Sequence, residues 1–128
     1  MPNFVIKVIG ASALAAAIFG ETSAEHIAVR VRGCDLVAPH LLEFELVNVC
    51  ISKMRRVPAD RELFLAAYRK RGTIKVATLD VDYAEVLALA QRTGLTSYDT
   101  SYLLLAQIPG VELVTLDRQL LAASEKFK

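Results

Sequence analysis

The chain has 128 residues, which fits a single domain (1–128) and is enough to bury a sizeable core. Hydrophobic residues make up 54% of it and charged residues 23%, a balance that excludes a disordered protein. Fifteen Lys and Arg residues against 14 Asp and Glu leave a net charge of +1. The chain as a whole therefore has no bulk attraction to nucleic acid or to a membrane surface, and such binding would need local clusters.

Membrane insertion and secretion are not expected. The longest nearly apolar stretch runs from Val8 to Phe19, well short of the ~20 residues of a membrane-spanning helix. No basic residue precedes Lys7, so this stretch does not match a signal peptide, and we expect a cytoplasmic protein. Cys34 and Cys50 have no spacing typical of a metal site or a disulfide framework, which predicts buried free thiols.

The order of hydrophobic segments predicts strands that alternate with helices. Ser12 and Ser97 are expected to cap helices, residues 22–25 to form a capping box, and Pro39 to end the second strand. The helix at 40–55 is expected to be mostly buried because its apolar residues are so dense. The expected strands are 4–9, 35–38, 74–79 and 111–116, and the expected helices are 13–19, 22–32, 40–55, 58–71, 82–92, 98–107 and one beginning at 117.

This alternation predicts an α/β domain with a parallel β-sheet covered on both faces by helices. In such sheets, ligands bind outside the carboxyl ends of the strands. Residues that follow strands are therefore the first candidates for a functional site.

Three acids follow or flank strand ends in this order. Glu45 lies in the apolar helix after the second strand, Asp99 in the first turn of a later helix, and Asp117 directly after the last strand. Converging carboxylates without Lys or Arg partners would repel one another, and a divalent cation removes that cost. Taken singly, Asp99 and Asp117 are also explained as carboxylates favoured by a helix N-terminus.

Glu45 is harder to explain by structure alone. Its neighbours are Phe44 and Leu46, in a segment where a buried carboxylate is rare unless it is paired or bound to a metal. Asn48 lies one turn later on the same helical face. This polar stripe favours a functional role for Glu45.

Four short motifs follow one another along the chain. They are Ala-Ser-Ala-Leu at 11–14, Ala-Pro at 38–39 with the later Glu45 and Asn48, Ser-Tyr-Asp-Thr-Ser-Tyr at 97–102, and Leu-Val-Thr-Leu-Asp-Arg at 113–118. In this order they resemble the PIN-domain nucleases, in particular the VapC-like toxins of toxin–antitoxin pairs, over nearly the whole chain. The resemblance implies a three-layer PIN-like fold and an Mg²⁺- or Mn²⁺-dependent ribonuclease that hydrolyses RNA phosphodiester bonds. It also implies a cognate antitoxin as partner and a homodimer.

The resemblance also assigns roles to individual residues. The three acids match the family's metal-binding and catalytic positions. Ser12 and Thr115 match small hydroxyl residues of its motifs, and Asn48 would orient a ligand or a water. A bound metal would acidify the attacking water and neutralise the phosphate.

Gly10 departs from the family pattern, because the first acid of the family stands at this position. Glu21 follows a whole helix and Glu43 faces away from Glu45, so neither replaces it. The chain could therefore be a weakened nuclease or a non-catalytic binding module that docks a protein partner. A phosphoacceptor receiver domain ranks last, because Gly10 and Ala11 supply no acidic pair after the first strand.

Two basic clusters, Lys53 with Arg55 and Arg56, and the run at 69–71, could contact an RNA backbone. Solvated helix C-termini explain them more simply. No aromatic residue lies between these cations, so the sequence does not predict a base-stacking surface. His26 and His40 have no acidic or thiol partner at a telling spacing and are interpreted as surface or capping residues.

Overall fold

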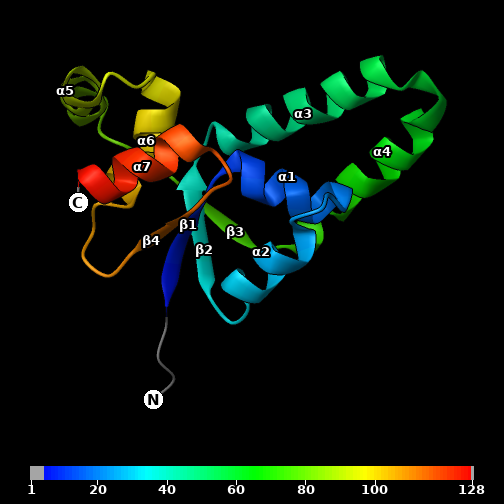
Figure 1. The fold of residues 1–128 in the computed structure, drawn as a ribbon, viewed down its shortest axis with the longest axis horizontal. Coiled ribbons are helices and arrows are strands. Elements are labelled where there is room, and N and C mark those ends of the chain that lie inside the picture. Colours follow the sequence, from blue (N-terminus) through cyan, green and yellow to red (C-terminus); the bar gives the residue numbers. More distant parts are fainter. Residues whose placement is uncertain (1–4, 128) are drawn as a thin grey trace.

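The computed structural model describes residues 5–127, which form a parallel sheet with helices around it (Figure 1). The expected strand residue Phe4 lies outside the described part. Short 3₁₀ turns at Pro58–Asp60 and Lys70–Thr73 flank α4. The elements are β1 (Ile6–Ile9), α1 (Ala11–Phe19), α2 (Ala24–Val31), β2 (Asp35–Pro39), α3 (Leu42–Arg56), α4 (Arg61–Arg69), β3 (Val76–Leu79), α5 (Tyr83–Thr93), α6 (Ser97–Leu105), β4 (Glu112–Val114) and α7 (Arg118–Lys126).

The four strands lie in the order β3-β2-β1-β4, and all pairs are parallel. The chain steps from β1 to β2 to β3 in one direction, then crosses back over the sheet to β4. Because such crossovers are right-handed, the reversal moves the helices to the other face. Accordingly, α1 to α4 pack together on one side and α5 to α7 on the other (Figure 1). The predicted α/β fold with a helix-covered parallel sheet is confirmed.

The strand order reverses between β1 and β4, and this switch point positions the site. Ile9 pairs with Val114, and the Gly10 amide extends the ladder by donating to the Val114 carbonyl at 2.9 Å. Loops that leave two neighbouring strands in opposite directions open a crevice at their carboxyl ends. The residues after Ile9 and after Val114 therefore face a common crevice.

The core is formed by β1, α1 and the side chains that close on them from both faces. Cys50 is buried and Cys34 half-buried, and both are free thiols. Within residues 5–127, no helix combines the length and the hydrophobicity that a bilayer span requires. The largest fully buried side chains include Ile9, Leu14, Ile27, Leu42, Leu46, Tyr102 and Leu103.

The expectation of a mostly buried helix at 40–55 is wrong. In α3 only Leu42, Leu46 and Cys50 are buried, while the Phe44 side chain is 77% exposed. The reason is geometric, because the far half of α3 pairs with α4 in a hairpin that extends beyond the sheet (Figure 1). One stripe of α3 then meets the core and the rest faces outward.

Two expected caps near the N-terminus are also wrong. The helix α1 begins one residue before Ser12, with Gly10 as its N-cap, because the Ser12 hydroxyl is engaged by the chain after β4. The capping box at 22–25 does not form, since Ser23 is the N-cap of α2 and makes no side-chain bond. Pro39 belongs to β2 as its last residue.

Candidate active site

Asp99 lies close enough to Glu45 and to Asp117 for their charges to interact. Glu45 comes from the first turn of α3 and Asp99 from the first turn of α6. Burial raises the pKa of the Glu45 carboxyl, the hydrogen bond from Tyr102 partly offsets this rise, and the charge of Asp99 adds to it. Burial likewise raises the pKa of Asp99, and the charge of Asp117 adds to this effect. Asp99 is therefore the carboxylate whose charge interacts with one neighbour in each direction.

Within residues 5–127, none of these three carboxylates forms an ion pair with Lys, Arg or His. Other acids nearby are neutralised: Glu21 pairs with Lys53 at 3.8 Å, and Glu43 pairs with Arg71. Glu21 and Glu43 thus serve the scaffold, and the site retains uncompensated negative charge.

Tyr102 orients Glu45, a role that the sequence interpretation missed. Its hydroxyl donates to Glu45 Oε1 at 2.6 Å, and its side chain is almost fully buried. Burial raises the pKa of Tyr102 far above its ordinary value, and the two neighbouring acids reinforce this, so the phenol keeps its proton as a donor. Tyr102 follows Asp99 by three residues on α6, and this spacing is the signal that could have revealed it.

Asp117 is fixed by hydroxyl groups and by its own helix. Ser12 Oγ accepts from the Leu116 amide at 2.9 Å and lies 3.2 Å from Thr115 Oγ1. Thr115 Oγ1 in turn accepts from the Asp117 amide at 3.1 Å. Asp117 Oδ1 caps α7 by accepting from Leu120 at 3.0 Å. One carboxylate oxygen of Asp117 is thus structural, and the other is available.

Thr96 fixes the start of α6. Its hydroxyl accepts from the Asp99 amide at 3.2 Å, so Thr96, and not Ser97 as expected, caps this helix. The Asp99 carboxylate therefore lies in the positive field of the first turn of α6. Burial and the charge of Asp117 raise the pKa of Asp99.

The chain is similar to known proteins in sequence and in fold. The PIN-domain family model matches residues 7–126. The chain belongs to the PIN-domain family. Ribonuclease VapC3 of Pyrobaculum aerophilum is 53% identical over 49 residues, a segment that covers 35% of each protein. The crystal structure of PAE2754 from Pyrobaculum aerophilum has a TM-score of 0.74 and 30% identity, and it covers 94% of this chain and 87% of its own.

Gly10 leaves this PIN domain without a side chain at the end of β1. Its φ of −78° and ψ of 157° are open to any residue, so the backbone does not require glycine. A Cβ there would lie 3.2 Å from Thr115 Oγ1 and 3.3 Å from Thr115 Cβ, which is tighter than an ordinary contact. Gly10 and Thr115 thus form a close-packed floor beside the acids.

The acids supply at most part of a metal site. Within residues 5–127, no group of three or more His, Cys, Asp or Glu side chains is placed so that it could hold a metal ion. Mg²⁺ does not need such a group, because it usually takes one or two carboxylates and completes its octahedron with water and substrate phosphate. Asp99, with Glu45 or Asp117 beside it and no basic partner, offers such a ligand set.

Asn48 lies in a cavity of about 480 Å³ next to the acids. It is exposed there, beside Ser12, Lys53 and Arg56. Lys53 also lies 5.3 Å from the centre of the Phe19 ring, so this part of the basic cluster has a scaffold role as well. The cavity is therefore lined both by the hydroxyl of Ser12 and by basic residues near the C-terminus of α3.

The structure also pairs His40 with an acid, contrary to the sequence interpretation. His40 Nε2 lies 2.7 Å from Asp80 Oδ1, and both side chains are exposed. The two residues directly follow β2 and β3, which are neighbours in the sheet. His26 is exposed, as expected.

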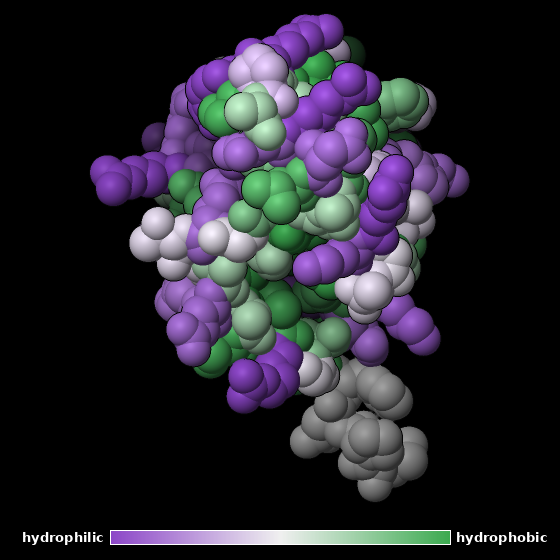
Figure 2. Space-filling view, turned by 90° about the vertical axis from the view of Figure 1, so that its right-hand side faces the viewer, coloured by the Kyte–Doolittle hydropathy of each residue, from purple (hydrophilic) through white to green (hydrophobic). Residues whose placement is uncertain are grey.

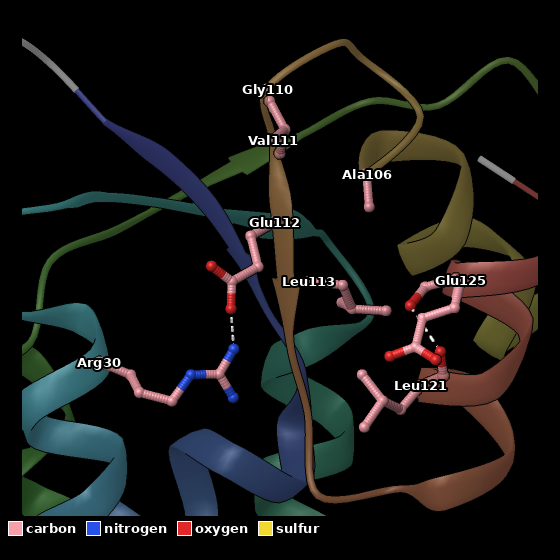
Figure 3. A pocket seen from close by; sticks show the side chains of 9 residues that line it. Arg30, Ala106, Gly110, Val111, Glu112, Leu113, Leu121 and Glu125 are labelled. Carbon is pink, nitrogen blue, oxygen red and sulfur yellow. Dashed lines mark hydrogen bonds and ion pairs between the residues drawn. The ribbon is translucent and has the colours of Figure 1, made fainter.

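A larger cavity of about 700 Å³ lies beside β4 and lacks the acids (Figure 3). Arg30 reaches into it and is neutralised by Glu112, which also pairs with Lys7 at 3.5 Å. Its other lining residues include Leu113 and Leu121. These contacts tie α2 to the sheet and provide no catalytic group.

Proposed function

We propose that this protein is a metal-dependent endoribonuclease of the PIN-domain toxin type, weakened by Gly10. The observation that carries this proposal is the charge interaction of Asp99 with Glu45 and with Asp117, three carboxylates that have no basic partner in the described chain. Such charge costs stability unless a cation or a proton neutralises it. The match to the PIN family and the similarity to a protein named as a ribonuclease support the same activity.

The residues of the site have different proposed roles. Asp99 and its two neighbours would hold Mg²⁺ or Mn²⁺, which when bound supplies a water of lowered pKa and neutralises phosphate charge. Tyr102 keeps Glu45 in one orientation, and the hydroxyl groups of Ser12 and Thr115 hold the turn that carries Asp117. A fixed carboxylate loses less entropy when it binds a ligand, so these contacts pre-organise the site.

RNA would enter along the cavity that contains Asn48. Arg56 can contact backbone phosphates there, whereas Lys53 is paired with Glu21, which also lines the cavity. Asn48 can bind a phosphate or sugar oxygen beside Ser12. This arrangement places positive charge on the approach and negative charge at the point of cleavage.

A second copy of the chain and an antitoxin are the proposed protein partners. Phe44, Val47, Val57 and Leu63, on α3, on α4 and between them, are all exposed. Figure 2 views the molecule from the side where these two helices meet and shows hydrophobic surface between charged side chains. Light scattering is expected to give the mass of a dimer. A monomer at micromolar concentration would contradict the homodimer.

A non-catalytic PIN-like binding module is the alternative function, and Gly10 is the observation that favours it. With one carboxylate fewer than the family pattern, metal affinity is expected to be lower. Such a module would bind its protein partner equally well with and without Mn²⁺.

Cleavage of a mixed RNA pool with Mn²⁺ or with EDTA tests the proposal. We expect slow, Mn²⁺-dependent cleavage that is lost in Asp99→Asn, which keeps the shape of the side chain and removes its charge. Arg32→Gln, an exposed change directly after α2 and outside the site, is the matched control and should cleave as the unaltered chain does. No Mn²⁺-dependent cleavage, or equal cleavage by Asp99→Asn, would contradict the proposal.

A further inference from the structure

A separate cavity of about 250 Å³ opens where β2 and β3 end, next to the acids but not lined by them. It is smaller than the ~300–1,000 Å³ of pockets that take drug-sized ligands, so one flat ring is the size of group it admits. Apolar residues, among them Pro39 and Val86, line part of it. Its polar lining residues are His40, Asp80, Tyr83, Ser97, Tyr98 and Ser101.

Two exposed tyrosines distinguish this cavity. The Tyr83 side chain is 84% exposed and that of Tyr98 is 63% exposed. Among residues 5–127, Phe44 is the one other aromatic side chain with comparable exposure. Aromatic rings held open to water beside a cavity are suited to stack on a nucleobase, because every base offers a π-face. The sequence did not predict this surface, because the two tyrosines belong to different helices.

The cavity is coupled to the acids through α6. Tyr98 lines the cavity and Asp99 belongs to the acidic site, and the two residues are consecutive in the first turn of α6. This turn is fixed, since Thr96 caps it and Ser101 Oγ donates to the Tyr98 carbonyl at 2.6 Å. The cavity and the acidic site are therefore held together by one rigid turn.

The rim of the cavity can read the edge of a base. Asp80 Oδ1 contacts His40 at 2.7 Å, and Asp80 Oδ2 makes no hydrogen bond in the described part of the chain. This free oxygen can accept from an N–H group of a base. The hydroxyl of Ser97 adds a donor and acceptor at the same rim. Exposed tyrosine rings beside polar groups at the rim suit a nucleobase better than an aliphatic side chain.

We propose that this cavity is a nucleobase subsite, which holds one unpaired RNA base beside the phosphate that is cleaved. The proposal rests on the proposed ribonuclease function and adds a contact with one base that sets the position of the RNA strand. Protein recognition of single-stranded RNA typically stacks splayed bases on aromatic side chains. The basic cavity beside Asn48 would hold the backbone, and the tyrosine cavity one base.

Equilibrium binding of a labelled single-stranded RNA decamer tests this subsite. The measurement is made in EDTA and at low salt, so that metal-dependent cleavage does not interfere and phosphate contacts are strong. A series of decamers, each lacking one base at a different position, is compared with the intact strand. We expect the loss of one particular base to weaken binding by roughly 5- to 100-fold, the range of a stacked base.

Tyr98→Ala and Tyr83→Ala are the informative variants, with Tyr98→Phe and Tyr83→Phe as matched controls that keep the rings. The alanine variants should bind the intact decamer more weakly by a similar factor and should no longer respond to the missing base. The phenylalanine controls should retain that response. If removing the base and removing a tyrosine ring weaken binding by independent factors, base and ring do not touch, and the subsite is overturned.

The outcomes separate the subsite from the nuclease. Mn²⁺-dependent cleavage with no position-specific loss of binding would leave the nuclease in place and remove the subsite. Position-specific binding that depends on the tyrosine rings, without cleavage under any metal, would support the subsite and remove the nuclease. No RNA binding at all would overturn the subsite.

Discussion

Replacing Gly10 by Asp restores a carboxylate at the end of β1 and tests whether the acids form a metal site. The backbone at Gly10 accepts an Asp, and the loss of a glycine gains about 0.4–1 kcal/mol of stability through the unfolded chain. As N-cap of α1, Asp adds only a few tenths of a kcal/mol over glycine, roughly 0.3 kcal/mol.

Crowding and charge act against these gains. The new Cβ would lie 3.2 Å from Thr115 Oγ1, and Thr115 is held by Ser12 and by the Asp117 amide. Such overpacking costs typically about 1–3 kcal/mol, and repulsion among four acids adds to the cost. We expect a net loss of about 1–2 kcal/mol without metal, which for a domain of this size lowers Tm by roughly 4–8 °C.

Mn²⁺ should reverse this loss. At a concentration 100 times Kd, a ligand stabilises the folded state by about 2.7 kcal/mol, so Gly10→Asp should regain its Tm when Mn²⁺ is added. Gly10→Asn is the matched control, because it adds the same bulk without the charge. The assays are thermal melting with and without Mn²⁺, and cleavage of a mixed RNA pool.

Two results would refute this reasoning. If Gly10→Asp gains neither Mn²⁺-dependent stability nor cleavage over Gly10→Asn, the three acids are not a metal site. If the unaltered chain already cleaves RNA as fast as Gly10→Asp, the glycine is no defect and the missing acid is unnecessary.

Three further changes test the energetics of the site. Asp99→Asn should increase the free energy of unfolding at pH 7, because a carboxyl whose pKa is raised in the folded state destabilises the fold as pH rises through that pKa. This gain should fade as pH falls toward 3.8, the usual pKa of the group, and a gain independent of pH would contradict the prediction. Tyr102→Phe removes the donor to Glu45 and should lower the free energy of unfolding in urea by about 1.5–3 kcal/mol, whereas no change would show that the bond is replaced by water. Thr100→Val should raise the free energy of unfolding by about 1 kcal/mol, because the buried Thr100 hydroxyl has no hydrogen-bond partner in the described chain. A lower free energy of unfolding would reveal that the hydroxyl has a partner.

The fold could be predicted from the sequence because its signals are local. Apolar segments of strand length alternate with helices, two of which end one or two residues before Gly33 and Gly94, both in the left-handed conformation. Parallel strands with helical crossovers then restrict the topology. The strand order needed the structure, and so did the exposure of α3, because which face of a helix meets the core depends on its neighbours.

The site was predictable only in part, because several of its contacts join residues that are far apart in the sequence. Asp117 follows the last strand directly, so its place at the sheet edge follows from the chain itself. The contacts of Tyr102 with Glu45 and of His40 with Asp80 join residues 57 and 40 positions apart. Helical spacing places Tyr102 near Asp99, but the partner of each residue in these pairs is set only when distant segments of the chain come together in the fold.

The energetics of the acids favour a nuclease over a module that only binds a partner. Burial and mutual repulsion make Glu45 and Asp99 unfavourable as charged groups in the folded chain at neutral pH. Neighbouring acids such as Glu43 have a basic partner, so the fold can neutralise a carboxylate close by. A binding module would gain stability by losing the uncompensated charges, whereas a nuclease needs them free for a cation. Glu45, Asp99 and Asp117 have no basic partner in the described chain, and Asp117 stands at the switch point, where the fold offers a crevice for a ligand.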